Sequence, residues 1–288
     1  MKEFAIDNQW ITLDTLETIL AENTQLKLTD EVKKTINDCR TYLDEKVAKS
    51  DRLIYGVNTG FGSLCDTAVS NDDLEQLQRN LVVSHACGMG ERVPDEIVRR
   101  MLLLKIFGLS HGASGVQLAT VERLVYFFNN DIFPVVFQQG SLGASGDLAP
   151  LAHLVLPLLG EGTVRYKGEE MTSVALNKLL GLETITLRSK EGLALLNGTQ
   201  FMSSYASYAI ANGRKLWKQF NEIAVISLDG FDGRVEPFGS HVNEIRQQVG
   251  QIKTAAIIRD LLAGSELAQR EKKHVQDPYS FRCIPQVH

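Results

Sequence analysis

The chain has 288 residues, of which 44% are hydrophobic and 23% charged, as is typical of a packed globular protein with one large domain or two ordinary ones. Its formal net charge is −5, and no basic run exceeds two residues, which argues against a nucleic-acid or anionic-membrane partner. The four cysteines form no CxxC pair, and the first residues lack the organisation of a signal peptide. We therefore expect reduced thiols, no membrane association and a cytoplasmic location.

Helical periodicity dominates the first part of the chain. Thr29 is a suitable N-cap residue, and apolar residues recur at helical spacing from there to about residue 49. Asn71 can cap a second helix, whose apolar residues extend to Val82. Pro94 suits the first turn of a third helix that runs to about Phe107.

The rest of the chain is also expected to be mainly helical. Further helices are predicted at about residues 115–129, 147–159, 173–180, 191–211, 214–228 and 241–263. Residues 163–168 fit one small β-hairpin, and no other strand is expected. Glycine and proline gather in the connections, where functional residues are often found. The pattern predicts a mainly α protein, a helical bundle with long loops.

The most distinctive segment is GSLGASGDLAPLAH, residues 140–153. Gly140, Gly143 and Gly146 lie three apart, which permits tight turns around Ala144 and Ser145, just before a predicted buried helix. The segment does not match a nucleophile elbow or a dinucleotide-binding loop. On composition alone, a glycine-rich loop before a buried helix would be the favoured interpretation. A second Ala-Ser-Gly at residues 113–115 lacks the same flanking residues and is interpreted as a loop and helix start.

This segment resembles the signature of the aromatic amino-acid ammonia-lyase and aminomutase family. The resemblance implies that Ala144, Ser145 and Gly146 cyclise into a methylidene-imidazolone (MIO) group. The Gly146 nitrogen would attack the Ala144 carbonyl, and two waters would be lost, one of them from the Ser145 side chain. Asp147 would assist proton transfer during ring closure. The resemblance implies no diffusible cofactor, and the six histidines show no metal-binding spacing.

Two further segments resemble the N-terminal active-site loops of the family. In YGVNTGFG, residues 55–62, Tyr55 would be the base that removes the β-proton of the substrate; a phenol needs nearby positive charge or hydrogen bonds for that role. In NLVVSHACGMG, residues 80–90, the pair Ser84-His85 occupies the position that reads the substrate. A Ser-His pair accompanies histidine as substrate, and one imidazole can donate a hydrogen bond where another accepts. Without these matches, a packed tyrosine and a satisfied core histidine would be the favoured interpretations.

Two later segments complete the resemblance. EGLALLNGTQ, residues 191–200, supplies Asn197, which would hydrogen-bond the MIO carbonyl. QDPYSFRCIPQVH, residues 276–288, supplies a carboxylate clamp in Arg282, a residue on the amine side of the substrate in Tyr279, and support for the MIO or the substrate in Gln276. Five matching segments in the same order are very improbable by chance.

The resemblance implies a carbon–nitrogen lyase that converts histidine into urocanate and ammonia. The substrate would attack the MIO through its amine or through its imidazole ring, and the sequence leaves both routes open. Two alternatives also remain: a tyrosine or phenylalanine lyase or aminomutase, against which Ser84-His85 argues, and a non-catalytic member in which the ring never forms.

The resemblance also implies an architecture: a long-helix bundle of the ammonia-lyase and fumarase-like type, which assembles as a homotetramer. Residues 1–110 would form an N-terminal domain with the YGVNTGFG and SHACGMG loops. Residues 111–288 would begin the central bundle, with the MIO loop. By the resemblance the chain ends well before the family does, so we expect the C-terminal part of the family to be absent and the broad apolar face of the predicted helix at 241–263 to lack its cover. We expect the 288-residue chain alone to associate through that face and to have little or no activity.

Overall fold

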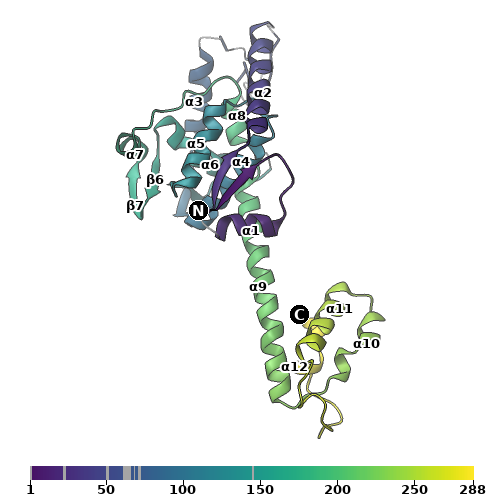
Figure 1. Ribbon diagram of the computed structural model, residues 1–288. Helices are drawn as coiled ribbons and strands as arrows, with labels where there is room; N and C mark the ends of the chain where they lie inside the picture. Colours follow the sequence, from purple (N-terminus) through teal and green to yellow (C-terminus); the bar gives the residue numbers. More distant parts are fainter. Residues whose placement is uncertain are drawn as a thin grey trace. The chain divides into compact units, whose positions relative to one another are not determined.

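The computed structural model describes residues 2–21, 24–49, 52–60, 66–67, 69–70, 73–144 and 146–288 (Figure 1). They form two compact units, Met1–Tyr208 and Ala209–His288. The expected domain division near residue 110 concerns the family architecture and stays a prediction.

The first unit is mainly helical, as the sequence predicts. Its helices are α1 (Leu13–Ala21), α2 (Asp30–Ala48), α3 (Leu74–His85), α4 (Asp95–Ser110), α5 (Leu118–Asn129), α6 (Leu148–Val155), a 3-10 turn (Leu156–Leu159), α7 (Ser173–Leu180), α8 (Glu191–Leu196) and the start of α9 (Gln200–Gly230). Thr29 caps α2 as expected, because its hydroxyl accepts a hydrogen bond from the Val32 nitrogen at 3.3 Å.

Three small sheets lie among these helices. They comprise a parallel pair, β1 (Glu3–Ile6) and β2 (Gln25–Leu28); an antiparallel pair, β3 (Met89–Arg92) and β5 (Phe137–Gln139); and β4 (Phe133–Pro134), β6 (Thr163–Tyr166) and β7 (Glu169–Thr172) in the order β4-β6-β7. The expected hairpin is β6–β7. The other strands exceed the one hairpin that was expected, because segments of two to four residues that pair with distant segments leave no local pattern.

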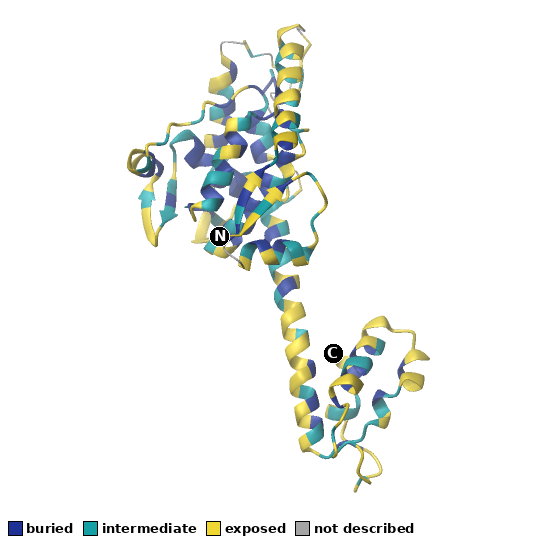
Figure 2. Ribbon diagram, viewed as in Figure 1, coloured by how far each residue is buried: buried dark blue, intermediate teal, exposed yellow. Residues whose placement is uncertain are grey.

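A continuous apolar core fills the first unit. Helix α4 contributes a long buried stretch, including Met101, Leu102 and Leu103, each 0% exposed. Helix α6 packs against α3, α4 and α8 and is buried along most of its length. Figure 2 shows these helices in dark blue at the centre of the unit. The loop before α6 is therefore held by a rigid, deeply buried helix.

The helical structure is interrupted between α8 and α9, where one continuous helix over residues 191–211 was expected. Asn197 follows α8 in an extended conformation, with φ −81° and ψ 117°. Helix α9 then runs without interruption through Gly213, where the sequence predicted a break. The Asn197-Gly198-Thr199 turn thus separates a short buried helix from a long one.

The second unit contains the end of α9 and several short helices. These are a 3-10 turn (Glu236–Phe238), α10 (Ser240–Glu244), α11 (Val249–Leu261), α12 (Tyr279–Arg282) and α13 (Ile284–Val287). Its own small core consists of Val225, Leu228, Phe238, Ile258, Leu262 and Ile284. The predicted single helix at 241–263 is wrong, because Gln247 takes a positive φ of 55° and Gln248 is extended, which divides it into α10 and α11. Two further short helices, α12 and α13, lie within residues 275–288, for which no helix was predicted.

Within the described ranges, none of the helices combines the length and the apolar character that crossing a bilayer requires. Over the same residues, no cluster of three or more His, Cys, Asp or Glu side chains is arranged to hold a metal ion.

Candidate active site

The predicted site residues fall into both units. The first unit contains Tyr55, the Ser84-His85 pair, Asn197 and the Ala-Ser-Gly loop, which we define as residues 140–147. Ser145 itself lies outside the described residues, as do Phe61 and Gly62 of the YGVNTGFG segment. The second unit contains Gln276, Tyr279 and Arg282.

Asp147 anchors the end of the Ala-Ser-Gly loop. Its side chain is fully buried, and one carboxylate oxygen accepts from the Ser141 hydroxyl at 2.9 Å while the other accepts from the Met202 nitrogen at 3.0 Å. Asp147 directly precedes α6, and Met202 lies in the first turn of α9. Because the amino-terminal end of a helix carries partial positive charge, both helix ends stabilise a negative charge at Asp147.

Gly146 is pressed against the turn that follows α8. A Cβ atom added to Gly146 would lie 3.0 Å from both the nitrogen and the oxygen of Gly198, and 3.4 Å from the Asn197 amide oxygen. The Gly198 oxygen also accepts from the Asp147 nitrogen at 2.8 Å. Gly146 has φ 114°, and backbone bridges pair it with Gly143 and Ala144. A side chain at this position would be crowded and its backbone strained, which favours glycine where the chain doubles back.

Ser84 and His85 lie at the end of α3 and share one acceptor. The Ser84 hydroxyl donates to the Leu81 carbonyl at 3.2 Å, and the His85 Nδ1 lies 2.7 Å from the same oxygen. Because a carbonyl oxygen can only accept, the proton of a neutral His85 ring is on Nδ1. The Nε2 atom of that ring is then a hydrogen-bond acceptor.

The segment after His85 lies beside the Ala-Ser-Gly loop. The Gly88 nitrogen donates to Nε2 of His153 on α6 at 3.0 Å, and the Phe137 ring packs edge-on to His153. A Cβ atom on Gly140 would lie 3.2 Å from the Gly88 Cα. Burial lowers the pKa of His153, which favours the neutral ring that this hydrogen bond needs. The structure therefore joins the predicted substrate-reading segment to the helix that follows the Ala-Ser-Gly loop.

Tyr55 begins a separate turn, and 51% of its surface is exposed. Asn58 holds this turn: its amide oxygen accepts from the Ile54 nitrogen at 2.7 Å, and its amide nitrogen donates to the Arg52 oxygen at 3.1 Å. Gly56 has a positive φ of 68°, which explains a glycine directly after the tyrosine. The YGVNTG sequence thus fixes its own backbone and presents Tyr55 at the surface.

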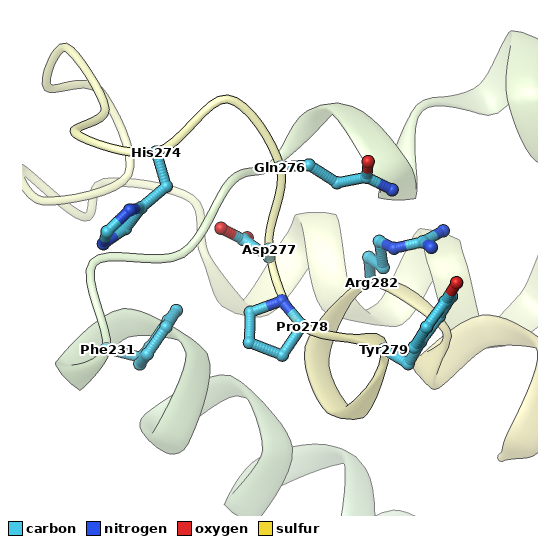
Figure 3. Close-up of a pocket in the computed structure, with 7 residues that line it drawn as sticks. All are labelled: Phe231, His274, Gln276, Asp277, Pro278, Tyr279 and Arg282. Carbon is cyan, nitrogen blue, oxygen red and sulfur yellow. The ribbon is translucent and has the colours of Figure 1, made fainter.

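In the second unit, the three predicted residues line one pocket of about 410 Å³ (Figure 3). The Arg282 guanidinium lies over the Tyr279 ring, 4.1 Å from its centroid. With its amide oxygen toward Arg282, Gln276 accepts from Nε at 2.9 Å and from Nη2 at 3.0 Å. The guanidinium is therefore held on one edge and one face, and its remaining N–H groups are suited to a carboxylate.

The backbone around this pocket is fixed by Asp277. Its side chain is 5% exposed and accepts a hydrogen bond from the Arg234 nitrogen, while Nη1 of Arg234 donates to the His274 oxygen at 2.7 Å. The Phe231 and Phe281 rings stack 4.6 Å apart. These contacts bind the 276–282 segment to the end of α9.

Three residues that shape the first-unit site were not predicted from the sequence. His153 lies in the quoted signature but was given no role, and Gly198 follows Asn197 in EGLALLNGTQ. Glu191, at the start of α8, is fully buried and accepts hydrogen bonds from the Gln117 nitrogen and amide, the Thr120 hydroxyl and the Arg188 nitrogen. The EGLALLNGTQ segment as a whole was the available signal for Gly198 and Glu191.

The chain matches known proteins over almost its whole length. The family model described as aromatic amino acid lyase matches residues 11–288. A histidine ammonia-lyase from Shouchella clausii is 45% identical over 279 residues, which cover 96% of this chain and 56% of that protein. The chain therefore spans a little over half the length of this curated relative.

Solved structures are also similar. Histidine ammonia-lyase from Trypanosoma cruzi has a TM-score of 0.86 at 33% identity, covering 100% of this chain and 53% of that one. Phenylalanine aminomutase from Pantoea agglomerans has a TM-score of 0.90 at 29% identity, covering 100% of this chain and 58% of that one. Together with the arrangement around Gly146, these matches establish that the chain belongs to the aromatic amino acid lyase family.

Proposed function

We propose that this protein acts as a histidine ammonia-lyase, which releases ammonia from histidine and leaves urocanate. The observation that carries the proposal is the close packing of Gly146 against the Asn197-Gly198 turn. The next residue, Asp147, donates a backbone hydrogen bond to Gly198 and accepts one from the Met202 nitrogen. A loop that is folded back on itself and pressed into a buried turn has the compactness that ring closure demands.

The residues of the loop fit the MIO group that the family is expected to use. Gly146 has no room for a side chain, and its nitrogen lies next to a backbone that doubles back at Gly143 and Ala144. Asn197 lies beside Gly146, where its amide can hydrogen-bond a ring carbonyl, and Ser145 would supply the methylidene carbon. When formed, the MIO group supplies the electrophilic carbon that ordinary side chains lack.

We assign the remaining steps to side chains of this chain. Tyr55 takes the β-proton of the substrate, because its turn presents a hydroxyl at the surface of the unit. Arg282 holds the substrate carboxylate, because Gln276 and Tyr279 fix its guanidinium and leave N–H groups for a two-pronged contact. Tyr279 and Gln276 line the same pocket; Tyr279 would contact the substrate on its amine side, and Gln276 would support the MIO group or the substrate.

The choice of histidine as substrate rests on His85. With its Nδ1 proton donated to the Leu81 carbonyl, the His85 Nε2 atom would accept a hydrogen bond from the N–H of the substrate imidazole. Phenylalanine and tyrosine have no ring N–H to offer there. The names of the relatives from Shouchella clausii and Trypanosoma cruzi support the same substrate.

The proposal also covers the assembly, the cellular location, the cofactor use and the domain organisation of the protein. We propose that the protein works as a homotetramer in the cytoplasm, with no diffusible cofactor. We also propose that residues 1–110 and 111–288 act as the N-terminal domain and the start of the bundle.

A substrate comparison tests the proposed function. Even at a low overall rate, the purified protein should form urocanate from histidine in preference to cinnamate from phenylalanine or coumarate from tyrosine, and peptide 140–153 should weigh two waters less than its sequence mass. His85→Phe should lower kcat/KM for histidine by roughly ten- to a hundredfold, because one directional hydrogen bond to a buried ring is lost. His111→Phe, at an exposed histidine, is the matched control and should have no effect. Preference for phenylalanine or tyrosine would refute the substrate, and β-amino acid products would indicate an aminomutase.

A further inference from the structure

Lys105 is a lysine inside the apolar core. It lies on α4 between buried apolar residues, and only 2% of its surface is exposed. Its Nζ atom donates to the Ala194 carbonyl at 3.3 Å. Burying an amine costs free energy unless it makes a hydrogen bond to a polar partner, so apolar packing alone does not account for this side chain.

The partner of Lys105 is the carboxyl-terminal end of α8. Ala194 is among the last four residues of α8, whose carbonyls find no partner within a helix. The amine of Lys105 therefore satisfies an otherwise unpaired carbonyl at the negative end of the helix dipole. The next turn of chain is Asn197-Gly198, against which Gly146 is pressed.

Lys105 also experiences the charge at the start of α6. Burial lowers the pKa of Lys105 to about 7, and the negative charge of Asp147 opposes this effect. Helices α4, α6 and α8 pack together in the first unit (Figure 1). The amine thus binds the end of α8, which packs against α6, the helix that follows the Ala-Ser-Gly loop.

We propose that Lys105 is a positioning residue for ring closure: it fixes the carbonyl end of α8, and so holds the Asn197-Gly198 turn against Gly146. This inference rests on the proposed function, because it presumes that the loop forms the MIO group. Lys105 acts through α8 and Asp147 and does not itself contact the substrate. Removal of this amine should slow ring closure and change the fold little.

The test measures ring closure by mass. Lys105→Met introduces a side chain of similar length that has no donor. This variant should show unchanged helical circular dichroism, but its peptide 140–153 should lose the two waters roughly tenfold more slowly or worse. Lys105→Arg, which keeps the charge and the donors, should restore most of the closed form. Lys105→Leu, which also lacks a donor, replaces the methionine variant should that variant fail to fold.

A buried control separates positioning from general stability. Leu103→Ala removes a fully buried side chain from the same helix and should lower the melting temperature without slowing ring closure. Equal ring closure in wild type and Lys105→Met would overturn the proposal, as would equal slowing in Leu103→Ala. If the wild-type peptide itself lacks the two-water deficit, the proposed function fails first, and the role of Lys105 with it.

Discussion

At the scale of single residues, the site depends on groups whose partners lie far away in the sequence. Ala144, Gly146 and Asp147 were predicted because the surrounding segment resembles the family signature. The contact of Asp147 with Met202 could not be predicted, because Met202 is 55 residues further along the chain. Lys105 was missed for a similar reason: a single lysine within an apolar helix is usually interpreted as exposed, and only the packed structure shows that it is buried.

The His153 hydrogen bond should make stability depend on pH. Burial lowers the pKa of His153 below its ordinary value of 6.5, so the unfolded chain takes up a proton there more readily than the folded chain. The stability that His153 contributes is therefore complete above about pH 6.5 and is lost as the pH falls below it. In His153→Gln, the amide oxygen can still accept from Gly88 but does not titrate. When the pH is lowered from 7.5 to 5.5, the melting temperature should fall more for wild type than for His153→Gln. Equal falls in the two proteins would contradict this role of His153.

At the scale of helices and strands, the sequence predicted correctly those elements whose ends are marked by a nearby residue, such as a capping side chain. Helix α2 begins at its Thr29 cap, and α7 has the predicted bounds of residues 173–180. The division of the predicted 241–263 helix at Gln247 was missed because nothing in its apolar spacing marks a positive φ. The break at Asn197-Gly198 was missed as well, although Asn-Gly is a common turn sequence; in the structure the turn contacts Gly146 and Asp147.

Two glycine substitutions test how closely α8 must pack. A Cβ atom at Gly192 would lie 3.0 Å from the Gln78 backbone oxygen and 2.9 Å from its side-chain oxygen, which accepts from the Gly192 nitrogen. Gly192→Ala should push α8 away from α3, destabilise the protein by about 1–3 kcal/mol and reduce ring closure. Gly213→Ala, within α9, meets nothing within 4 Å and should stabilise the protein by about 0.5–1 kcal/mol. Denaturant unfolding measures both, and equal effects would show that α8 tolerates displacement.

At the scale of the whole molecule, the predicted roles divide between two compact units. The residues around the Ala-Ser-Gly loop belong to Met1–Tyr208, and the predicted carboxylate clamp belongs to Ala209–His288. Each unit has its own apolar core, and α9 contributes to both. Composition and helical periodicity predicted the mainly helical class, but no sequence signal marked the division near residue 208.

A core substitution in the second unit should therefore separate two properties. Phe238 is fully buried there, and Phe238→Ala should destabilise that unit by about 3–5 kcal/mol. We expect the two-water deficit of peptide 140–153 to persist, while the KM for histidine rises because Arg282 is no longer held. Mass spectrometry and steady-state kinetics on the same sample measure both. Loss of the deficit in this variant would mean that ring closure also requires the second unit.

The binding of Asp147 to Met202 has a consequence for biosynthesis. The Gly198 wall and the first turn of α9 are synthesised some fifty residues after the Ala-Ser-Gly loop, so the loop leaves the ribosome without the contacts that compress it. Ring closure would then have to wait until α8 and α9 have been made and folded. Since the two waters are not regained, the mass deficit would be a permanent chemical record that a given molecule had once reached its native fold, even after it is denatured.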